Sequence, residues 1–558
     1  MKLFNYLRQL LPTWRDYRDL KRSWRGDIFA GITVGIVALP LALAFGVSSG
    51  VGAEVGLVTA IVAGFVAAVF GGSNIQVSGP TGAMVVVLGP IVVSHGVGTV
   101  AVLSILAGIF VLIAGLLKLG RVVGYVPWPV IEGFTLGIAV IIFLQQVPAA
   151  IGAKPGPSDN ALLAAIESFQ EADWSHLQNI VLPILIVAIV AGIMVFAPRI
   201  HPQLPGSILA IILVSLAVFL LNLPVERIGE LPSSLPAPEI PEINLDLLIM
   251  LSGPALTVAA LAAIESLLSI RVAAGLADTG AYDADRELVG QGLASLAAGF
   301  FGGMPATGAI ARTAVNVRAG GRTRLSAIVH SIVLLGIVYL ASTVVSVIPL
   351  AALSGVLMVT AFRMVSVATV RALVGSTKSD TVVFFVTAII TVSFDLIFAV
   401  GIGIAVAAFF SLRGLSKASG VHREELPDPV EVGDEQIALF RLDGSLFFGA
   451  ADRMLEEVSK IQNVSVVIIR MSQLQVLDAT GARVVTEMIL SLERRGVTVL
   501  IKGIQPRHLK LLTHVGVVAS LRHKAHLFDR LDEAVAHARA HIRGDEELYE
   551  DESQLIEG

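Results

Sequence analysis

The sequence predicts an α-helical membrane protein of fourteen transmembrane segments, built as a seven-plus-seven inverted repeat and followed by a small α/β cytoplasmic domain. Three observations support this fold class: charges are sparse between about Phe29 and Phe410, that region holds apolar stretches long enough to cross a bilayer, and one motif occurs in it twice. Of the 558 residues, 55% are hydrophobic and 15% are charged, whereas soluble domains carry about a quarter charged residues. The residues after Phe410 have an ordinary soluble composition, so we expect two domains in different solvents.

The composition excludes several kinds of site. The chain has no cysteine, which excludes disulfides, thiolate metal sites and cysteine nucleophiles, and we predict no metal site and no cofactor. The net charge of -5 gives no reason to expect nucleic acid as a partner. Residues 1–28 are charged and aromatic, so we expect a cytoplasmic N-terminal arm and no cleavable signal peptide.

The apolar region divides at glycines, prolines and charge clusters into fourteen candidate spans. A helix needs about 20 apolar residues to cross the hydrocarbon core, because each residue advances it by about 1.5 Å. The candidates lie near 29–49, 55–70, 80–94, 98–117, 126–145, 180–196, 207–223, 251–275, 288–301, 306–317, 325–347, 350–369, 380–394 and 396–412. Together they predict a transmembrane domain over 29–412.

The distribution of basic residues predicts the orientation of these spans. The N-terminal arm is rich in Lys and Arg, which places it in the cytoplasm by the positive-inside rule. With fourteen crossings, basic loops such as 318–324 also fall inside, whereas the long acidic loops 149–179 and 224–246 fall outside. The acidic stretch from Asp278 to Glu287 is an exception. We therefore expect a multi-pass protein of the inner cell membrane with both termini in the cytoplasm.

Two segments of the apolar region repeat one another. Residues 70–84 begin Phe-Gly-Gly and reach Thr-Gly-Ala-Met at Thr81, and residues 301–310 begin Phe-Gly-Gly and reach Thr-Gly-Ala-Ile at Thr307. The two tetrads fall in the third and tenth spans. Because the two spans are seven positions apart, an odd number, the two copies have opposite orientations, and the sequence predicts an inverted repeat.

These interrupted spans also predict a binding site. Extended backbone at membrane depth is tolerated where protein buries it or where it lines a polar cavity, and short spans at matching places of two repeats indicate a transporter's binding site. Each extended stretch would lead into a helix whose free amides and positive dipole end suit an anion. The alternative, that the glycines and prolines only pack helices, explains each segment singly but not the matched pair. The residues expected to bind the anion are Thr81, Gly82, Ala83, Thr307, Gly308 and Ala309.

Two charged residues lie inside otherwise apolar spans. Glu265 is in the eighth span, and Arg312 lies about one turn into the tenth. A charge at this depth costs at least ~2.5–3.5 kcal/mol on insertion scales, so it is usually paired or faces a cavity. We expect Arg312 to complement the anion, and Glu265, with Ser269 one turn further on the same face, to bind a coupling proton or cation. The alternative is an ion pair between Glu265 and Arg312 that only neutralises both charges.

After a linker over 413–435, short apolar runs alternate with amphipathic stretches. Strands are predicted at 437–442, 445–448, 464–470 and 497–502, and helices at 451–461, 481–495, 507–519 and 530–543. This alternation predicts a sheet covered by helices over 436–543, and the acidic tail 544–558 is expected to be disordered. The sequence shows neither a Gly-rich phosphate loop nor a Ser, His, Asp order, so we predict no enzyme.

The chain resembles the sulfate permease (SulP) family of anion transporters over nearly its whole length. The resemblance rests on residues 36–45, 78–83 and 302–316 and on a C-terminal domain that resembles a STAS domain (sulfate transporter and anti-sigma-factor antagonist). The soluble antagonists carry Asp-Ser-Ser-Gly where this chain has Asp-Ala-Thr-Gly at 478–481. Thr480 therefore occupies their phosphorylatable, regulatory position, and a helix N-terminal cap is the alternative role for this threonine.

The resemblance implies a core domain of spans 1–4 and 8–11, a gate domain of spans 5–7 and 12–14, an elevator-type movement of one against the other, and a homodimer. It also implies that the anion lies between the third and tenth half-helices. A sodium-coupled bicarbonate branch of the family uses an Asp and a Thr on the eighth span, with backbone and a Thr hydroxyl on the tenth. The matching positions here are Glu265, Ser269, Gly308, Ala309 and Ile310. These departures favour H+ over Na+ as the coupling ion, or no coupling cation.

The sequence thus predicts a secondary active transporter of a small anion: bicarbonate, sulfate or a dicarboxylate such as fumarate. Its partners would be that anion, the lipid bilayer and a cytoplasmic protein at the STAS domain. Three alternatives stay open. A uracil/purine-type permease shares this fold but would not explain the STAS domain or Arg312. A passive channel is the second, and an anion-responsive membrane sensor that signals through the STAS domain is the third.

Overall fold

The structure, a computed structural model, describes residues 6, 8–158, 160–172, 174–200, 205–229, 233–277, 280–394, 396–418, 420–427, 429–446 and 463–544. The chain forms two compact units, Met1–Ile404 and Ala405–Gly558. The predicted helix at 451–461 and residues 545–558 of the predicted tail lie outside the described residues.

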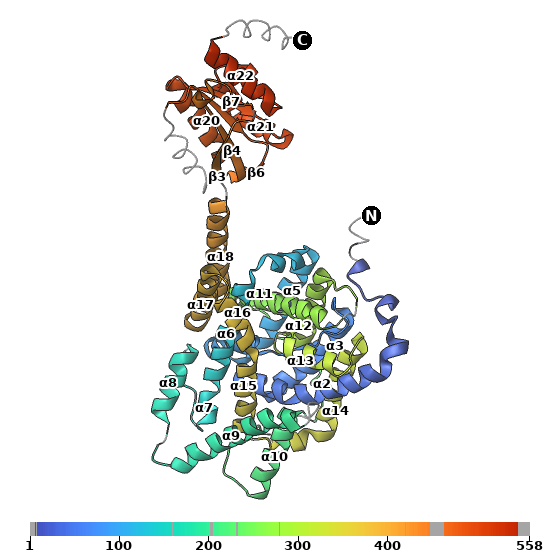
Figure 1. The fold of residues 1–558 in the computed structure, drawn as a ribbon. Helices are drawn as coiled ribbons and strands as arrows, with labels where there is room; N and C mark the ends of the chain where they lie inside the picture. The colour runs from blue at the N-terminus through green and yellow to red at the C-terminus, as the bar shows by residue number, and fades with distance from the viewer. Residues whose placement is uncertain are drawn as a thin grey trace. The chain divides into compact units, whose positions relative to one another are not determined.

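Helices make up the first unit (Figure 1). In chain order the helices are η1 (Trp14–Tyr17), α2 (Leu20–Ser48), α3 (Ala53–Phe70), α4 (Gly82–His95), η2 (Val97–Thr99), α5 (Val100–Leu116), η3 (Leu119–Tyr125), α6 (Trp128–Gln145), α7 (Val147–Ala150), α8 (Ala161–Glu171), α9 (Leu177–Ile200), α10 (Gly206–Leu220), α11 (Leu245–Leu276), α12 (Ala284–Phe300), α13 (Ile310–Arg318), α14 (Arg324–Ser346), α15 (Leu350–Met364), α16 (Val367–Val374), α17 (Lys378–Ser393) and α18 (Leu396–Ala418). Each of the fourteen predicted spans overlaps one of these helices, whereas α8 lies in a stretch predicted as a loop.

The third and tenth spans are short helices that follow extended backbone. Among the described residues, nine helical stretches are long and apolar enough to cross a membrane, and α4 is not one of them. α13 has 9 residues, which extend only about 13 Å at 1.5 Å per residue. The two-residue strands β1 (Ser78–Gly79) and β2 (Thr307–Gly308) precede α4 and α13. The repeated motif therefore marks interrupted spans, as the sequence predicts.

Glycines let helices of the first unit approach closely. A Cβ added to Gly108 on α5 would lie 2.8 Å from the carbonyl oxygen of Gly292 on α12, and a Cβ added to Gly31 on α2 would lie 2.5 Å from the carbonyl oxygen of Ser326 on α14. Such close backbone approach gives van der Waals packing, which holds helices together in lipid. Within this frame α3 packs on β1 and α11 packs on β2.

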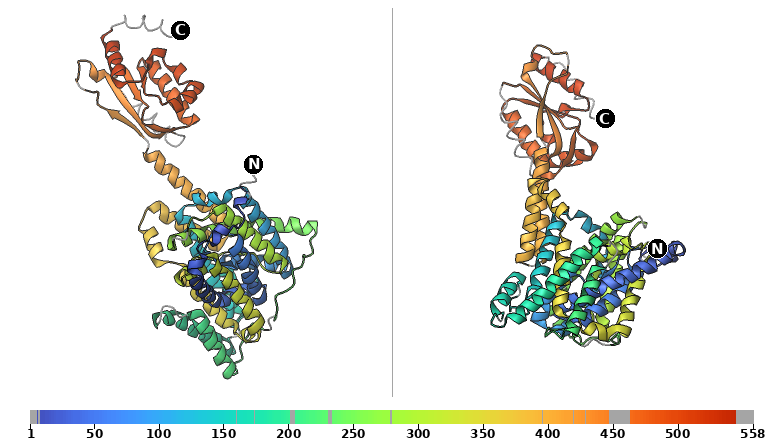
Figure 2. Two further views of the ribbon diagram at one scale, coloured as in Figure 1. Left: turned by 90° about the vertical axis from the view of Figure 1, so that its right-hand side faces the viewer. Right: turned by 60° about the horizontal axis from the view of Figure 1, so that its bottom comes forward.

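The second unit is built around one sheet (Figure 2). Its strands follow the order β3-β4-β5-β7-β8, with β6 paired to β4. β3 runs antiparallel to β4, and the other pairs are parallel. The strands are β3 (Gly420–Glu424), β4 (Ile437–Leu446), β5 (Val466–Arg470), β6 (Leu474–Leu477), β7 (Thr498–Lys502) and β8 (Leu527–Phe528), and the helices are η4 (Asp434–Gln436), α20 (Ala479–Arg494), α21 (Pro506–Val515), η5 (Val518–Ser520), η6 (Lys524–His526) and α22 (Leu531–Arg543).

Helices cover both faces of this sheet, because successive side chains of a strand point to opposite faces. Ala438 and Phe440 of β4 pack in one buried cluster with residues of α20 and α21. Ile437 and Leu439 of the same strand pack in another cluster with residues of α22. The sheet covered by helices is therefore confirmed.

Some predictions for the second unit need correction. The strands predicted at 437–442 and 445–448 are one strand, β4, as far as the described residues extend. Asp443-Gly444 has the sequence of a turn, but Gly444, with φ of 76°, lies at a register shift where β4 changes its partner from β5 to β6. The short strands β6 and β8 are not predicted, and β3 lies in the range predicted as a linker.

Candidate functional site

The two interrupted spans meet through their extended backbone. Ser78 pairs with Gly308 and Gly79 with Thr307 in an antiparallel ladder. The Ala309 amide donates to the carbonyl oxygen of Val77 at 2.8 Å. Each extended stretch thus satisfies the polar backbone of the other, which is required where no water is available. The structure brings the six predicted anion-binding residues into one place.

The first turns of the two half-helices carry free amides. Neither α4 nor α13 has a side-chain hydrogen bond at its N-terminal cap. Within the part of the chain that the structure describes, six amides have no acceptor: those of Gly82, Ala83, Met84, Ile310, Ala311 and Arg312. The amides of Gly308 and Ala309 are already used, the former by the Ser266 hydroxyl at 3.0 Å. The free donors of the second repeat therefore begin after the predicted tetrad residues, at Ile310.

Helix α11 contacts both repeats through adjacent residues. The Thr81 hydroxyl donates to Oε2 of Glu265 at 2.7 Å, while Ser266 accepts the Gly308 amide. The Thr307 hydroxyl donates to the Gly308 carbonyl oxygen at 3.1 Å. Ser269 is fully buried, and its hydroxyl has no partner among the described residues. Glu265 is therefore joined to the anion site, whereas Ser269 lies one turn away and has no hydrogen bond to it among the described residues.

Arg312 is the buried cation of the site. It is 2% exposed, and Nη2 donates to the Pro80 carbonyl oxygen, just before α4. Nη1 has no partner within the described residues. Nor do those residues include an ion pair between Arg312 and Glu265, since each side chain bonds to the first repeat separately. The direct ion pair considered for these two residues is therefore not formed, whereas neutralisation of one charge by the other stays an alternative.

A further set of polar side chains, not predicted from the sequence, lies next to the crossing strands β1 and β2. Nε2 of Gln76 and Nε2 of Gln291 both donate to Oε1 of Glu287, at 2.9 and 2.8 Å. Gln291 also donates to the Ser78 hydroxyl at 2.5 Å. Gln76 lies within the repeated motif, and that position is the sequence signal that could have identified it. Glu287 has no such signal, because the sequence places it in the acidic stretch between two predicted spans.

A cavity lies near the start of α4, and Val86 and Val87 of that helix are among the residues that line it. It has a volume of about 1010 Å³, and the ends of α2, α4 and α6, residues 148–165 and the start of α15 line it. None of the predicted anion-binding residues lines it. Its lining includes residues from 149–158 and 224–226, which belong to the two loops predicted to be outside.

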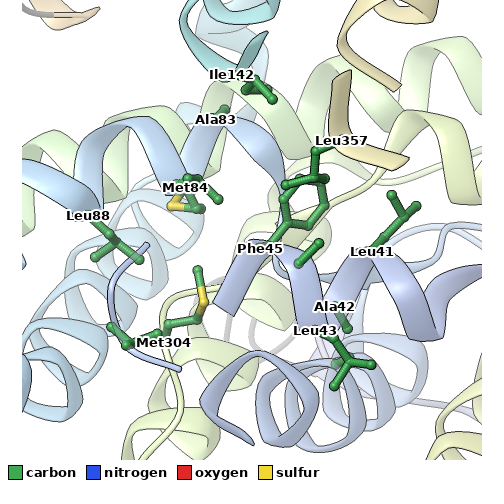
Figure 3. Close-up of a cluster of buried hydrophobic side chains, with 14 of the residues drawn as sticks. Leu41, Ala42, Leu43, Phe45, Ala83, Met84, Leu88, Ile142, Met304 and Leu357 are labelled. Atoms are coloured by element: carbon green, nitrogen blue, oxygen red, sulfur yellow. The ribbon is translucent and has the colours of Figure 1, made fainter. Parts of the chain in front are cut away.

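Apolar packing separates this cavity from the half-helix start at α4. A Cβ added to Gly82 would overlap Cδ1 of Ile142 and lie 3.5 Å from Cε1 of Phe45. Ile142 is 2% exposed and reaches from α6 toward Ala83, next to Phe45 and Leu357 (Figure 3). Gly82 thus allows an apolar side chain of a predicted gate helix to cover the free amides of α4.

In the second unit, Thr480 lies in the first turn of α20. The cap of this helix is Asp478, whose Oδ1 accepts the Gly481 amide at 2.7 Å. Thr480 itself is exposed. The capping role considered for Thr480 is therefore wrong, because the preceding aspartate fills it.

The comparisons with known proteins agree with this geometry. The sulfate permease family matches residues 24–387 and the STAS domain matches residues 429–534. The chain is 34% identical to the putative sulfate transporter YvdB of Bacillus subtilis, over 92% of this chain and 97% of that protein. It is 31% identical to the bicarbonate transporter BicA of Synechocystis sp., over 86% of this chain and 88% of that protein.

A solved structure supports the fold. The murine Solute Carrier 26 family member A9 anion transporter, in its inward-facing state, matches 96% of this chain and 95% of its own with a TM-score of 0.82 and 16% identity. At that identity the likeness concerns the fold alone. The curated relatives are named as transporters and not as enzymes. The chain therefore belongs to the sulfate permease family of anion transporters and carries a STAS domain after its membrane-spanning part.

Proposed function

We propose that this chain is a secondary active transporter of a small oxyanion, sulfate or bicarbonate, which binds between the first turns of α4 and α13. The observation that carries the proposal is that, among the described residues, the amides of both first turns have no acceptor and Nη1 of Arg312 has no hydrogen-bond partner. Helix N-termini bind anions through such amides and through the helix dipole. Sulfate and bicarbonate are the substrates named for the relatives YvdB and BicA.

The charges at the site distinguish the two anions. Each helix N-terminus is equivalent to about +0.5 elementary charge, so two of them with Arg312 supply about +2. A dianion such as sulfate or fumarate is balanced when Glu265 is protonated, and a monoanion such as bicarbonate when Glu265 is ionised. Because an uncompensated buried charge is costly, we infer that sulfate moves together with a proton on Glu265. Na+ has less support here, since Ile310 stands where the sodium-coupled branch has a Thr hydroxyl.

In an alternating-access cycle, the half-helices that bind the anion would move, and the cavity would not. In this proposal α2–α5 and α11–α14 form the core, which carries both half-helices, and the remaining helices of the first unit form the gate. The contact of Ile142 with Gly82 is apolar, and contacts of this kind can break without leaving an unpaired polar group. We further propose a homodimer in the inner cell membrane. Cross-linking of single cysteines introduced into this cysteine-free chain tests the dimer.

Uptake into proteoliposomes tests the transport proposal. Purified protein is reconstituted, and uptake of radiolabelled sulfate, bicarbonate and fumarate is measured with and without pH and Na+ gradients. We expect sulfate uptake to rise with an acid outside and to ignore Na+. Binding of these anions without uptake would refute transport and favour a sensor.

The Glu265→Gln variant tests the coupling. Its neutral amide imitates the protonated acid, so sulfate uptake should persist but lose its dependence on pH, while bicarbonate uptake should fall. The matched control is Glu132→Gln, because Glu132 on α6 bonds to Trp128 at 3.0 Å and not to the site. An unchanged pH profile in Glu265→Gln would refute proton coupling at this residue.

We also propose that Thr480 is a phosphorylation site through which the STAS domain regulates transport, by contact with a cytoplasmic protein partner. Its exposure in the first turn of α20 supports this, because a phosphate is favourable at a helix N-terminus. Mass spectrometry of protein purified from its own cells tests it. Uptake by Thr480→Ala equal to that of the parent, with no phosphate on the parent, would contradict the proposal.

A further inference from the structure

Glu287 is a second buried carboxylate of the first unit, separate from Glu265. It is 2% exposed. Its Oε2 accepts the Gly72 amide at 2.8 Å, and its Oε1 accepts Nε2 of both Gln76 and Gln291. In the ranges that the structure describes, no ion pair includes Glu287. A buried carboxylate is tolerated when hydrogen bonds satisfy it, and here three N–H donors do so.

The two glutamines that donate to Glu287 each contact one of the crossing strands. Gln291 donates to the Ser78 hydroxyl of β1. Nε2 of Gln76 lies directly against Gly308 of β2, where an added Cβ would overlap it and would lie 2.7 Å from Cδ. Ser78 and Gly308 are partners in the ladder. Through these two glutamines, the carboxylate of Glu287 is connected to both Ser78 and Gly308, the paired residues of the strands that precede the two half-helices.

From these contacts we infer that Glu287 is a positioning residue for the anion site. Its carboxylate orients Gln76 and Gln291, and the two amides fix the crossing of β1 and β2. This inference rests on the proposed function, because it concerns the same site. It also separates the two carboxylates by role. The donors to Glu287 are one backbone amide and two side-chain amides, whereas Glu265 accepts from the hydroxyl of Thr81.

The variant that tests the inference is Glu287→Gln, in the full chain. An amide at this position has one acceptor oxygen, so its NH2 group would face either the Gly72 amide or the two glutamines. The matched control is Asp285→Asn on the same helix. Asp285 is also buried, and its Oδ1 accepts the Gly120 amide at 3.0 Å, which lies in η3 and not at the crossing strands.

Two readouts are measured on both variants. The first is hydrogen exchange of the backbone over 76–84 and 305–312, which needs no anion. The second is KM and maximal rate for radiolabelled sulfate and bicarbonate in proteoliposomes. For Glu287→Gln we expect faster exchange in both segments and a KM raised about tenfold, which corresponds to about 1.4 kcal/mol. For Asp285→Asn we expect parental exchange there and a parental KM.

The outcomes separate this inference from the proposed function. Parental exchange and KM in Glu287→Gln overturn the inference, and so do equal effects in Asp285→Asn, which would show a general loosening of α12. If the parent takes up neither anion, the proposed function fails while the exchange readout still decides the inference. If Glu287→Gln does not fold, Gln291→Leu replaces it. That variant should speed exchange over 76–84 and raise KM, and a failure to do either overturns the inference.

Discussion

A methyl group at Gly308 is the smallest perturbation that tests the geometry of the site. In Gly308→Ala the new Cβ would lie 2.7 Å from Cδ of Gln76 and 3.3 Å from Cα of Ser266, while ordinary contacts begin at 3.4 Å. The nearest atom is Nε2 of Gln76, which the new Cβ would overlap, so this nitrogen has to retreat by about 1.6 Å to restore van der Waals contact. Its hydrogen bond to Glu287, now 2.9 Å, would then lengthen well beyond hydrogen-bonding distance.

The lost interaction sets the size of the effect. A hydrogen bond to a charged group contributes about 1.5–3 kcal/mol. If all of this free energy is lost from anion binding, the affinity for the anion falls by about 10- to 150-fold, since 1.4 kcal/mol is a factor of ten. If the backbone of β2 moves instead, the amides that follow it move as well, and affinity also falls. Binding of sulfate and bicarbonate to purified protein is the assay, with size-exclusion chromatography as a check on folding.

A control and a double variant make this prediction specific. Gly253 lies on α11 with nothing within 4 Å of an added Cβ, so Gly253→Ala should bind like the parent. In Gly308→Ala combined with Gln76→Ala the colliding side chain is gone, but its hydrogen bond to Glu287 stays lost, so we expect an affinity no lower than that of Gly308→Ala. Parental affinity in Gly308→Ala would refute the reasoning, and so would a double variant weaker than the single one.

The other predictions concern the gate, the soluble unit and the orientation. Ile142→Ala should let a membrane-impermeant thiol reagent modify Ala83→Cys faster, whereas Ile141→Ala, which changes a residue lining the cavity, should not; equal rates would show that Ile142 does not cover the site. Burial, followed by the nearby His537 and His523, lowers the pKa of His526 from 6.5 to about 4, so the unfolded chain binds a proton below about pH 6.5 that the folded unit does not bind until about pH 4. Stability of the second unit should fall as pH drops through this window, and His526→Phe should reduce the fall, as measured by hydrogen exchange over 521–543; an unchanged profile would contradict this. A cysteine at Ser445 should react only from the cytoplasmic side of intact cells, and labelling from outside would contradict the fourteen-span count.

Hydrophobic length and the repeated motif were sufficient to predict most of the helices. A span must be apolar over the bilayer thickness whatever it packs against, so α2, α5 and α14 could be located from the sequence. The short helix α8 could not, because a helix of eleven residues in a predicted loop has no such length requirement. The strand β4 was divided at Asp443-Gly444 because a turn and a bulge use the same residues.

The carboxylates before and within α12 show where charge counting fails. The stretch from Asp278 to Glu287 was an acidic exception to the predicted orientation. Asp285 and Glu287 are buried acceptors of the Gly120 and Gly72 amides, so they are part of the protein interior rather than loop charges. Sequence alone does not show whether an acidic residue next to an apolar span faces water or a backbone amide.

The two copies of the tetrad have one sequence pattern but two structures, and the difference determines the chemistry of the site. In the first copy Thr81 is the cap and the helix begins at Gly82. In the second copy Ser266 and Val77 take the amides of Gly308 and Ala309, so the helix begins only at Ile310. This delay puts Arg312 in the first turn, where its guanidinium reaches Pro80. The two tetrads predict that two helix ends meet, but residues outside the tetrads decide that only one end also supplies a formal positive charge and that α11 faces it with Glu265. A site with two helix N-termini, one fixed cation and one carboxylate can be neutral with either a monoanion or a dianion, and the proton on Glu265 would then decide which.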